Sequence, residues 1–246
     1  MVGYEDAILD CLTVGDQAVP LDALEILCAQ RRQERLDKEA FNAALASLVA
    51  AYEVRRQGTS IKRVQPDVAE IELEAPLLDF LKIEAVKYLK LDPSQCVVEN
   101  TARGGAYGGG RWSRPDFTLA AIRSWRFDPR RQLDLMTFEL KNRAGTNVLA
   151  VHEALAHSRF AHFPYLVCPR ALREDDRHRI RQECAEHGVG LVTFELSFPG
   201  GRRQVANYTF ELEAVRHTPD AERVEQYLSE RLSSEGQAHL EKVAKG

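Results

Sequence analysis

The chain has 246 residues, of which 44% are hydrophobic and 28% are charged, and its net charge is −4 at pH 7. This length allows one large domain or two smaller ones, and the composition excludes a disordered or fibrous chain. No apolar run approaches the ~18 residues that span a bilayer, and the start MVGYEDAILD lacks the basic region of a signal peptide, so we expect a cytoplasmic protein without membrane contact. Five scattered cysteines without CxxC spacing predict reduced thiols.

Residues 1–65 contain three helical patterns followed by a hairpin pattern. Apolar spacing predicts helices over residues 4–12, 21–30 and 38–50, the last capped by Asp37. The stretch AYEVRRQGTSIKRV alternates around a turn at 58–60 and predicts two short strands. Three helices and a hairpin of this size resemble a winged helix-turn-helix domain. The resemblance implies that the wing contacts phosphates through Arg55, Arg56, Lys62 and Arg63.

The third helical pattern of this domain does not display the Arg, Asn and Gln side chains of a base-reading helix. The net charge of residues 1–64 is −2, with eight basic and ten acidic residues. We therefore expect DNA contact mainly through the wing. Packing of this helix against the second domain or another subunit stays open.

The second predicted domain, residues 66–213, follows a boundary at Gln65-Pro66-Asp67. It begins with an amphipathic helix over 71–91, and a short strand and a loop with five glycines follow up to residue 110. The loop does not match a P-loop, which needs Gly-Lys-Ser or Gly-Lys-Thr before a helix, so nucleotide hydrolysis is disfavoured. Two interpretations of this glycine-rich loop stay open: a clamp on a nucleic-acid backbone, and a mobile surface loop.

The chain is organised around a hairpin over residues 111–143. Two apolar runs separated by turn chemistry at Asp128-Pro129 predict two adjacent strands. Glu139 and Lys141 project from the same face because side chains alternate along a strand. A turn centred near Pro129 makes Asp116 face about position 142, within one or two ladder steps of both. Two carboxylates and an ammonium are therefore expected to converge.

Neighbouring carboxylates repel, and their burial costs roughly several kcal/mol unless a positive charge compensates. Mg²⁺ prefers oxygen ligands and often binds through one or two carboxylates, so Asp116 and Glu139 suit it, as they suit Mn²⁺. Lys141 can hold or deprotonate the attacking water and offset charge in the transition state. Each half of the pattern alone is ordinary, since Pro-Asp is a common turn dipeptide and Glu-x-Lys a common strand edge.

In this order and spacing, Pro115, Asp116, Glu139 and Lys141 resemble the motif of the PD-(D/E)xK nuclease superfamily, over about residues 70–212. The resemblance implies an α/β fold, with a mixed β-sheet flanked by helices as in restriction endonucleases. It also implies a further metal ligand from the helix before the hairpin. Glu74 is the first candidate and Glu72 the second, and an acidic first turn that complements the helix dipole is the alternative for both.

Charge is distributed unevenly around the candidate site. Residues 101–145 hold nine Lys or Arg against four Asp or Glu, and residues 66–100 hold three against eight. A local basic patch matters more than the net charge, because exposed charges are screened beyond ~10 Å. We expect Arg103, Arg111 and Arg114 to contact phosphates, with a solvated arginine-rich loop as the alternative.

After the hairpin, Thr146 or Asn147 caps a predicted helix that reaches residue 162. The family resemblance implies that His157 and Arg159 of this helix contact the substrate; a capping or surface role is the alternative. A strand at 163–169, a helix at 175–187 and a strand at 188–196 predict a parallel pairing within a mixed sheet, with an edge strand at 205–213. Residues 214–246 are expected to be a helical extension whose apolar positions dock a partner subunit in a homodimer: Val224, Tyr227, Leu228 and Leu232.

The sequence therefore predicts a Mg²⁺-dependent endonuclease that hydrolyses phosphodiester bonds in nucleic acid, with DNA favoured by the family and a defence or restriction role implied by it. The alternative is a non-catalytic nucleic-acid-binding or regulatory protein that uses a winged helix and a nuclease-like scaffold. The complete set of Asp116, Glu139 and Lys141 favours the nuclease.

Overall fold

The computed structural model describes residues 3–12, 18–50, 54–63, 68–102, 114–170, 172, 174–197 and 204–245. The chain divides into two compact units, one with residues 1–67, 171–174 and 196–204 and the other with 68–170, 175–195 and 205–246. The boundary expected at Gln65-Pro66-Asp67 lies outside the described residues, as do the glycines of the loop before the hairpin. Within the described ranges, no helix is both long and apolar enough to cross a membrane.

The first unit combines helices with a small antiparallel sheet of strand order β1-β3-β2. Its elements are α1 (Tyr4–Cys11), β1 (Val19–Pro20), α2 (Leu21–Arg32), α3 (Lys38–Ala50), β2 (Val54–Gln57) and β3 (Ser60–Arg63). Asp37 caps α3 as expected, since its Oδ1 accepts hydrogen bonds from the amides of Glu39 and Ala40, both at 3.1 Å. Gly58 turns the β2–β3 hairpin with a φ of 60°. Ile8, Leu24, Phe41, Leu45 and Ile61 are buried in a common core.

The second unit is built on a six-stranded mixed sheet of order β4-β5-β6-β7-β8-β9. β4, β5 and β6 pair antiparallel, and β6, β7 and β8 pair parallel, so the expected mixed sheet with flanking helices is confirmed. The strands are β4 (Cys96–Asn100), β5 (Phe117–Trp125), β6 (Asp128–Leu140), β7 (Phe163–Pro169), β8 (Gly190–Ser197) and β9 (Gln204–Leu212). The helices are α4 (Glu70–Phe80), a π-turn η1 (Leu81–Ala85), α5 (Val86–Tyr88), a 3₁₀ turn η2 (Pro93–Gln95), α6 (Val148–Ala156), a 3₁₀ turn η3 (His157–Arg159), α7 (Glu174–His187), α8 (Ala221–Arg231) and α9 (Ser234–Lys245).

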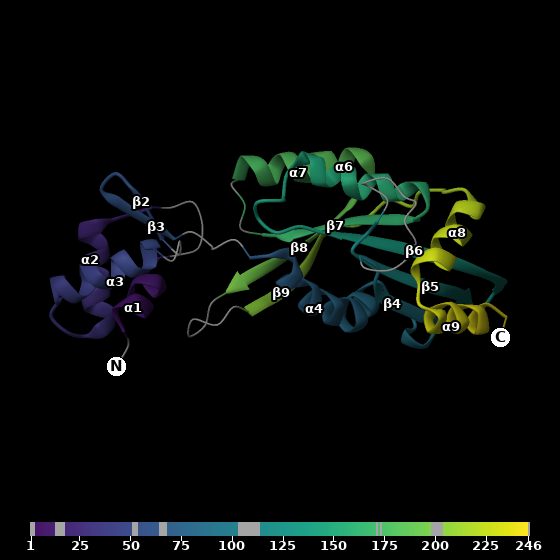
Figure 1. Ribbon diagram of the computed structural model, residues 1–246, viewed down its shortest axis with the longest axis horizontal. Helices are drawn as coiled ribbons and strands as arrows, with labels where there is room; N and C mark the ends of the chain where they lie inside the picture. The colour runs from purple at the N-terminus through teal and green to yellow at the C-terminus, as the bar shows by residue number, and fades with distance from the viewer. Residues whose placement is uncertain are drawn as a thin grey trace. The chain divides into compact units, whose positions relative to one another are not determined.

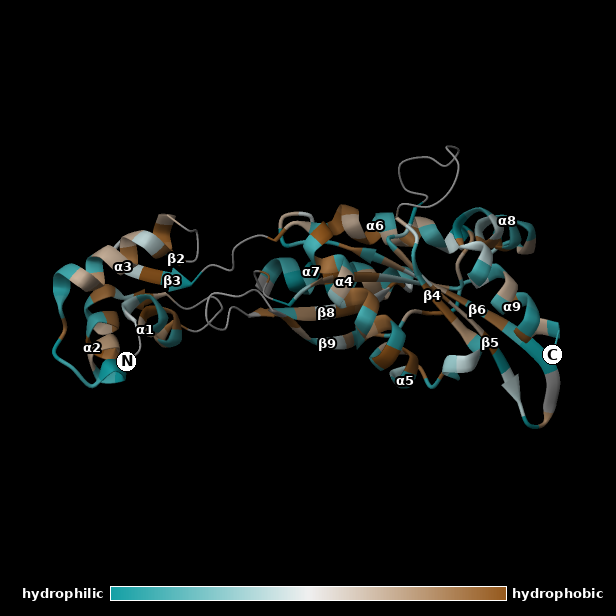
Figure 2. Cartoon of the chain, turned by 60° about the horizontal axis from the view of Figure 1, so that its bottom comes forward, coloured by the Kyte–Doolittle hydropathy of each residue, from teal (hydrophilic) through white to brown (hydrophobic). Residues whose placement is uncertain are grey.

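Helices cover both faces of this sheet. α6 and α7 lie on one face and α4 lies on the other (Figure 1). β5 is hydrophobic over most of its length, the β5–β6 hairpin becomes more hydrophilic toward its turn, and α7 and α8 are largely hydrophilic (Figure 2). Successive side chains of a strand point to opposite faces of the sheet, so a continuous apolar run buries side chains on both faces. Phe138, for example, stacks on Tyr165 of β7 with ring centroids 5.1 Å apart.

The β5–β6 hairpin turns earlier than its sequence indicated. Trp125 pairs with Asp128, so the turn lies at Arg126 and Phe127, and Asp128-Pro129 begins β6. The prediction of a turn near Pro129 was therefore wrong by about three residues. Proline is tolerated at a strand start, where a missing N–H breaks little pairing. Because Phe117 pairs with Phe138, Asp116 lies beside Glu139 and not opposite position 142.

The C-terminal helices complete the core of the second unit. Val224, Tyr227 and Leu232 are 6%, 5% and 5% exposed and pack in a cluster with Ala120 and Leu135 of the sheet. Leu228 packs against the same cluster. Val224, Tyr227 and Leu232 therefore do not dock a partner subunit, because the chain's own sheet covers them; a homodimer stays a prediction. Residues 214–246 also belong to the same compact unit as the sheet and are not a separate extension.

Candidate active site

Asp116 directly precedes β5 and is fixed by hydrogen bonds to both neighbouring strands. Its amide donates to the carbonyl of Phe138 at 3.1 Å, and its carbonyl accepts from the amide of Thr101 at 2.8 Å. Its carboxylate Oδ2 accepts a 2.7 Å hydrogen bond from the amide of Leu140. The side chain is therefore directed to the end of β6, where Glu139 lies.

Glu139 and Lys141 form an ion pair at this end of β6. Glu139 is 7% exposed, and Lys141 Nζ lies 2.6 Å from its Oε1. Lys141 Nζ also lies 2.9 Å from Oε2 of Glu153 on α6, and the Lys141 amide donates to the Val167 carbonyl of β7 at 2.9 Å. The ammonium thus bridges a strand carboxylate and a helix carboxylate. Glu153 was not among the predicted site residues.

Burial dominates the electrostatics of the site, and neighbouring carboxylates add to its effect. Burial raises the pKa of Asp116 to about 6; the Leu140 amide and Lys141 oppose this, and the charges of Glu70 and Glu74 add to it. Burial and the charge of Asp116 raise the pKa of Glu139 to about 8, although Lys141 opposes them. Burial lowers the pKa of Lys141, but its contacts with Glu139 and Glu153 outweigh burial and raise this pKa above the usual value. One ammonium therefore does not neutralise the cluster.

Helix α4 brings two further carboxylates to Asp116. Glu74 is half-buried and its Oε2 accepts from Asn100 Nδ2 at 2.9 Å, and exposed Glu70 accepts from the Asn142 amide at 3.3 Å. The predicted candidate Glu74 thus lies near the site, whereas Glu72 is exposed on the same helix. Glu70 was missed. Its spacing of four residues from Glu74, which places both on one helix face, was the available signal.

His157 and Arg159 differ in their surroundings. His157 is 1% exposed, and its Nε2 lies 3.6 Å from Glu139 Oε2. Burial, together with the charges of Lys141 and Arg159, lowers the pKa of His157 to about 3. Arg159 is exposed and its Nε donates to the Ala156 carbonyl at 2.9 Å. The His157 ring therefore faces a site carboxylate, and Arg159 is the member of the pair that reaches solvent.

The predicted phosphate contacts are distributed over both units. Arg103 and Arg111 lie outside the described residues, and Arg114 is half-buried two positions before Asp116. On the hairpin of the first unit, Arg55 and Arg56 are exposed and Lys62 is half-buried. Arg63 has a structural contact, since its Nη1 donates to the Leu9 carbonyl at 2.9 Å and so holds the end of α1.

The donor set at Asp116 and Glu139 fits Mg²⁺ or Mn²⁺. Both side chains offer hard carboxylate oxygens, and burial, with a smaller contribution from neighbouring carboxylates, raises their pKa values; a bound dication would stabilise their charged forms. Mg²⁺ accepts one or two protein carboxylates and completes its shell with water and phosphate oxygens. Among the described residues, three ligand atoms from His, Cys, Asp or Glu gather within 4.8 Å at a different place, His152, Glu183 and His187.

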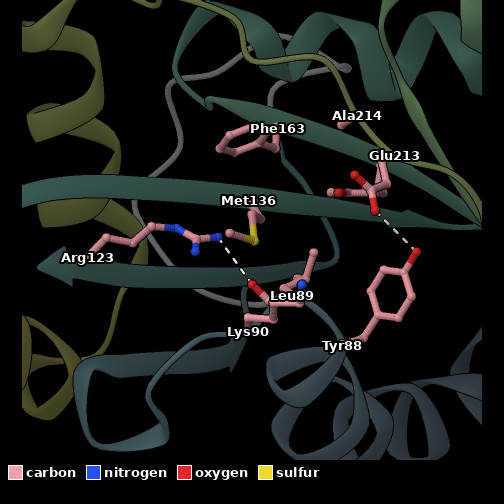
Figure 3. Close-up of a pocket in the computed structure, with 9 residues that line it drawn as sticks. Tyr88, Leu89, Lys90, Arg123, Met136, Phe163, Glu213 and Ala214 are labelled. Carbon is pink, nitrogen blue, oxygen red and sulfur yellow. Dashed lines mark hydrogen bonds between the residues drawn. The ribbon is translucent and has the colours of Figure 1, made fainter. Parts of the chain in front are cut away.

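A cavity of about 250 Å³ elsewhere in the second unit is lined by none of these site residues. Figure 3 shows Arg123, Met136, Tyr88 and Glu213 around it. Arg123 pairs with the buried carboxylate of Asp134 and donates to the Leu89 carbonyl at 3.3 Å, and Tyr88 Oη donates to Glu213 Oε1 at 3.2 Å. These polar groups already have partners within the protein, so this cavity is not the candidate active site.

The second unit is therefore an α/β fold built on a mixed sheet, with a carboxylate–lysine cluster at the open end of the β5–β6 hairpin, where β5 begins and β6 ends. A scan against models of known protein families matches none, and a search of curated proteins finds no similar sequence. The class of protein is therefore inferred from the residues and their geometry.

Proposed function

We propose that this protein is a metal-dependent nuclease that hydrolyses phosphodiester bonds, with Asp116, Glu139 and Lys141 as its catalytic residues. The observation that carries the proposal is the convergence of these three side chains at one end of the β5–β6 hairpin, where Glu139 is 7% exposed. Burying carboxylates side by side opposes folding, so such clusters are concentrated at functional sites.

Asp116 and Glu139 would hold the metal ion, Mg²⁺ or Mn²⁺, and Glu70 and Glu74 of α4 lie close enough to act on the charge of Asp116. When bound, the ion would polarise the scissile phosphate and lower the pKa of a bound water. The protein's own part is to fix the carboxylates. The Leu140 amide orients Asp116, and the Lys141 ammonium orients Glu139.

Lys141 acts in this proposal as a fixed positive charge. Its contacts with Glu139 and Glu153 keep it protonated at neutral pH, since they raise its pKa. A preorganised ammonium beside the scissile phosphate stabilises the negative charge that develops on phosphate oxygens. This role differs from that of a general base, which would need a lowered pKa.

The substrate class we propose is nucleic acid, with DNA favoured. In the first unit, Arg55 pairs directly with Lys62 across the β2–β3 hairpin. Neighbouring Ile61 is 1% exposed in the core, so these two cations project from the opposite face of the hairpin. Two positive charges in directly opposed positions on one face of the hairpin suit the phosphates of an anionic backbone.

A non-catalytic nucleic-acid-binding protein is the second candidate. The observation that favours it is the position of Lys141 between Glu139 and Glu153, at 2.6 and 2.9 Å, because an internal cation already balances part of the cluster. In that case the nuclease-like sheet would serve as a scaffold, and the metal would be dispensable for binding.

Cleavage by the purified full chain separates the two candidates. Single- and double-stranded DNA and RNA are incubated with Mg²⁺, Mn²⁺ or EDTA, using wild type, Asp116→Asn and Glu139→Gln. Exposed Asp79 on α4 supplies the control Asp79→Asn. The nuclease proposal expects metal-dependent cleavage by wild type and Asp79→Asn and a loss on the order of 10³-fold in the site variants, since a metal's contribution of several kcal/mol corresponds to that factor. Equal rates for wild type and Asp116→Asn would overturn the assigned site, and binding without cleavage on every substrate would favour the second candidate.

A further inference from the structure

Two neighbouring helices of the second unit bring two histidines and a carboxylate together. His152 lies on α6, and Glu183 and His187 lie one turn apart on α7; the two helices are side by side on one face of the sheet (Figure 1). One ligand atom from each residue lies within 4.8 Å of the other two. His187 Nε2 is 3.6 Å from Glu183 Oε2, and the rings of His152 and His187 have centroids 5.4 Å apart.

The backbone under this cluster is held by the core. On α6, Val151 and Ala154 are fully buried on either side of His152, and on α7, Cys184 is fully buried next to Glu183. α7 ends directly after His187 because Gly188 adopts a φ of +67°, which a side chain would strain, and a Cβ there would also meet Val215 at 3.0 Å. All three cluster side chains are half-buried, so they flank the buried stripes of their helices and face one another.

We propose that His152, Glu183 and His187 form a binding site for a zinc-class dication. Zn²⁺ takes imidazole nitrogen and carboxylate oxygen at about 2.0–2.2 Å in tetrahedral geometry, which separates ligand atoms by roughly 3.3 Å. The 3.6 Å spacing of Glu183 and His187 is close to that value, and the ligand atom of His152 lies within 4.8 Å of both, so a bound ion would need only a small movement of this side chain. Three protein ligands leave a fourth position for water.

The two histidines distinguish this site from the one proposed at Asp116 and Glu139. Imidazole suits Zn²⁺ and other late first-row dications, whereas Mg²⁺ and Ca²⁺ prefer an all-oxygen shell. The cluster was not predicted from the sequence, because His152 has no second histidine at zinc-binding spacing on its own helix. The other two residues, Glu183 and His187, lie on α7, about thirty residues further along the chain. A bound ion would tie α6 to α7. This inference does not depend on nuclease activity.

The test is Zn²⁺ binding to the metal-stripped full chain, measured by competition with a chromophoric zinc chelator and by the Zn²⁺ dependence of Tm. The variants are His152→Gln, His187→Gln and Glu183→Gln. The matched control is His178→Gln, an exposed histidine on the same helix outside the cluster. Asp116→Asn separates this site from the proposed magnesium site.

We expect one equivalent of Zn²⁺ to bind and to raise Tm, because a ligand that binds only the folded state stabilises it. Each ligand variant should weaken binding at least tenfold, whereas His178→Gln and Asp116→Asn should bind as wild type does. Wild-type NMR gives a second measurement that needs no folded variant, in which Zn²⁺ shifts the ring signals of His152 and His187 and leaves those of His178 unchanged. Absence of saturable binding, or binding that His152→Gln and His187→Gln leave intact, would overturn the proposal.

Discussion

Lys141 Nζ lies 2.6 Å from Glu139 Oε1, and because Glu139 is 7% exposed, this ion pair is largely withdrawn from water. The second contact, to Glu153 on α6, fixes the ammonium between the sheet and the helix that covers it. The pair sets the geometry of the cluster without balancing its charge, since Asp116, Glu70 and Glu74 add negative charge nearby.

Lys141→Met should separate metal binding from catalysis. The neutral side chain leaves Glu139 without its partner, and breaking a buried pair costs about 3 kcal/mol of unfolding free energy. We expect Mg²⁺ still to bind and to restore part of that stability, whereas cleavage should fall by on the order of 10²-fold or more because the charge beside the phosphate is removed. Urea unfolding with and without Mg²⁺ and single-turnover cleavage measure the two effects.

Lys141→Arg is the companion variant. It keeps a cation between Glu139 and Glu153, so stability should recover, but the planar guanidinium does not replace a compact ammonium at the phosphate, so cleavage should recover poorly. Cleavage by Lys141→Met at the wild-type rate would show that the ammonium takes no part in catalysis.

Stability of the metal-free protein should fall as pH rises from 6.5 to 8. The pKa of Glu139 is raised from its ordinary 4.5 to about 8, so the folded state binds more protons than the unfolded state across that interval. His157 and Asp116, with pKa values of about 3 and about 6, contribute mainly at lower pH.

Glu139→Gln should flatten the pH profile of stability between pH 6.5 and 8, and saturating Mg²⁺ should stabilise wild type more at pH 8 than at pH 6.5. The free energy of unfolding, measured in urea at each pH, gives the profile; an unchanged slope in Glu139→Gln would rule out this carboxyl as its source.

Neutralising the wing should flatten the salt dependence of nucleic-acid binding. Arg55→Ala and Arg56→Ala remove exposed charges from β2, and for every phosphate interaction that they abolish, the slope of log K against log salt should decrease by about 0.9. Affinity should fall equally on all sequences, because phosphate contacts do not read bases. Arg35→Ala, an exposed arginine of the same unit outside the hairpin, is the control. If the variant that combines Arg55→Ala with Arg56→Ala has the same salt dependence of binding as wild type, nucleic acid binds away from the β2–β3 hairpin.

The C-terminal helices should be essential to stability. Tyr227 is 5% exposed, stacks on Phe160 with ring centroids 4.2 Å apart and is hydrogen-bonded to Thr118 Oγ1 at 2.5 Å. Tyr227→Ala should cost about 3–5 kcal/mol through the cavity it leaves, and Tyr227→Phe about 1 kcal/mol through the missing hydrogen bond. Phe127→Ala, at an aromatic residue 89% exposed on the hairpin turn, should change stability by less than about 0.5 kcal/mol. Denaturant unfolding compares the three; a small loss in Tyr227→Ala would mean that α8 is not part of the cooperative core.

Local pattern in the sequence was enough to predict most elements. Two apolar runs separated by turn residues indicated the β5–β6 hairpin, Asp37 marked the start of α3, and strand–helix–strand alternation indicated the parallel pairing of β7 and β8. These signals are local, because a cap, a turn or an amphipathic face is specified within a few neighbouring residues. The approach of Asp116 to Glu139 followed from the hairpin alone, although its register was three residues in error.

Contacts between elements distant along the chain were decided by the tertiary structure. Glu153 meets Lys141 only because α6 packs across β6, and His152 meets Glu183 and His187 only because α7 lies beside α6. Likewise, the apolar stripe of α8 is equally suited to a partner or to its own sheet, and packing against Ala120 and Leu135 settled which one covers it. The sequence by itself determined which residues share a face of an element; only the packing of whole elements determined which faces meet, because that depends on burying apolar surface across the entire unit.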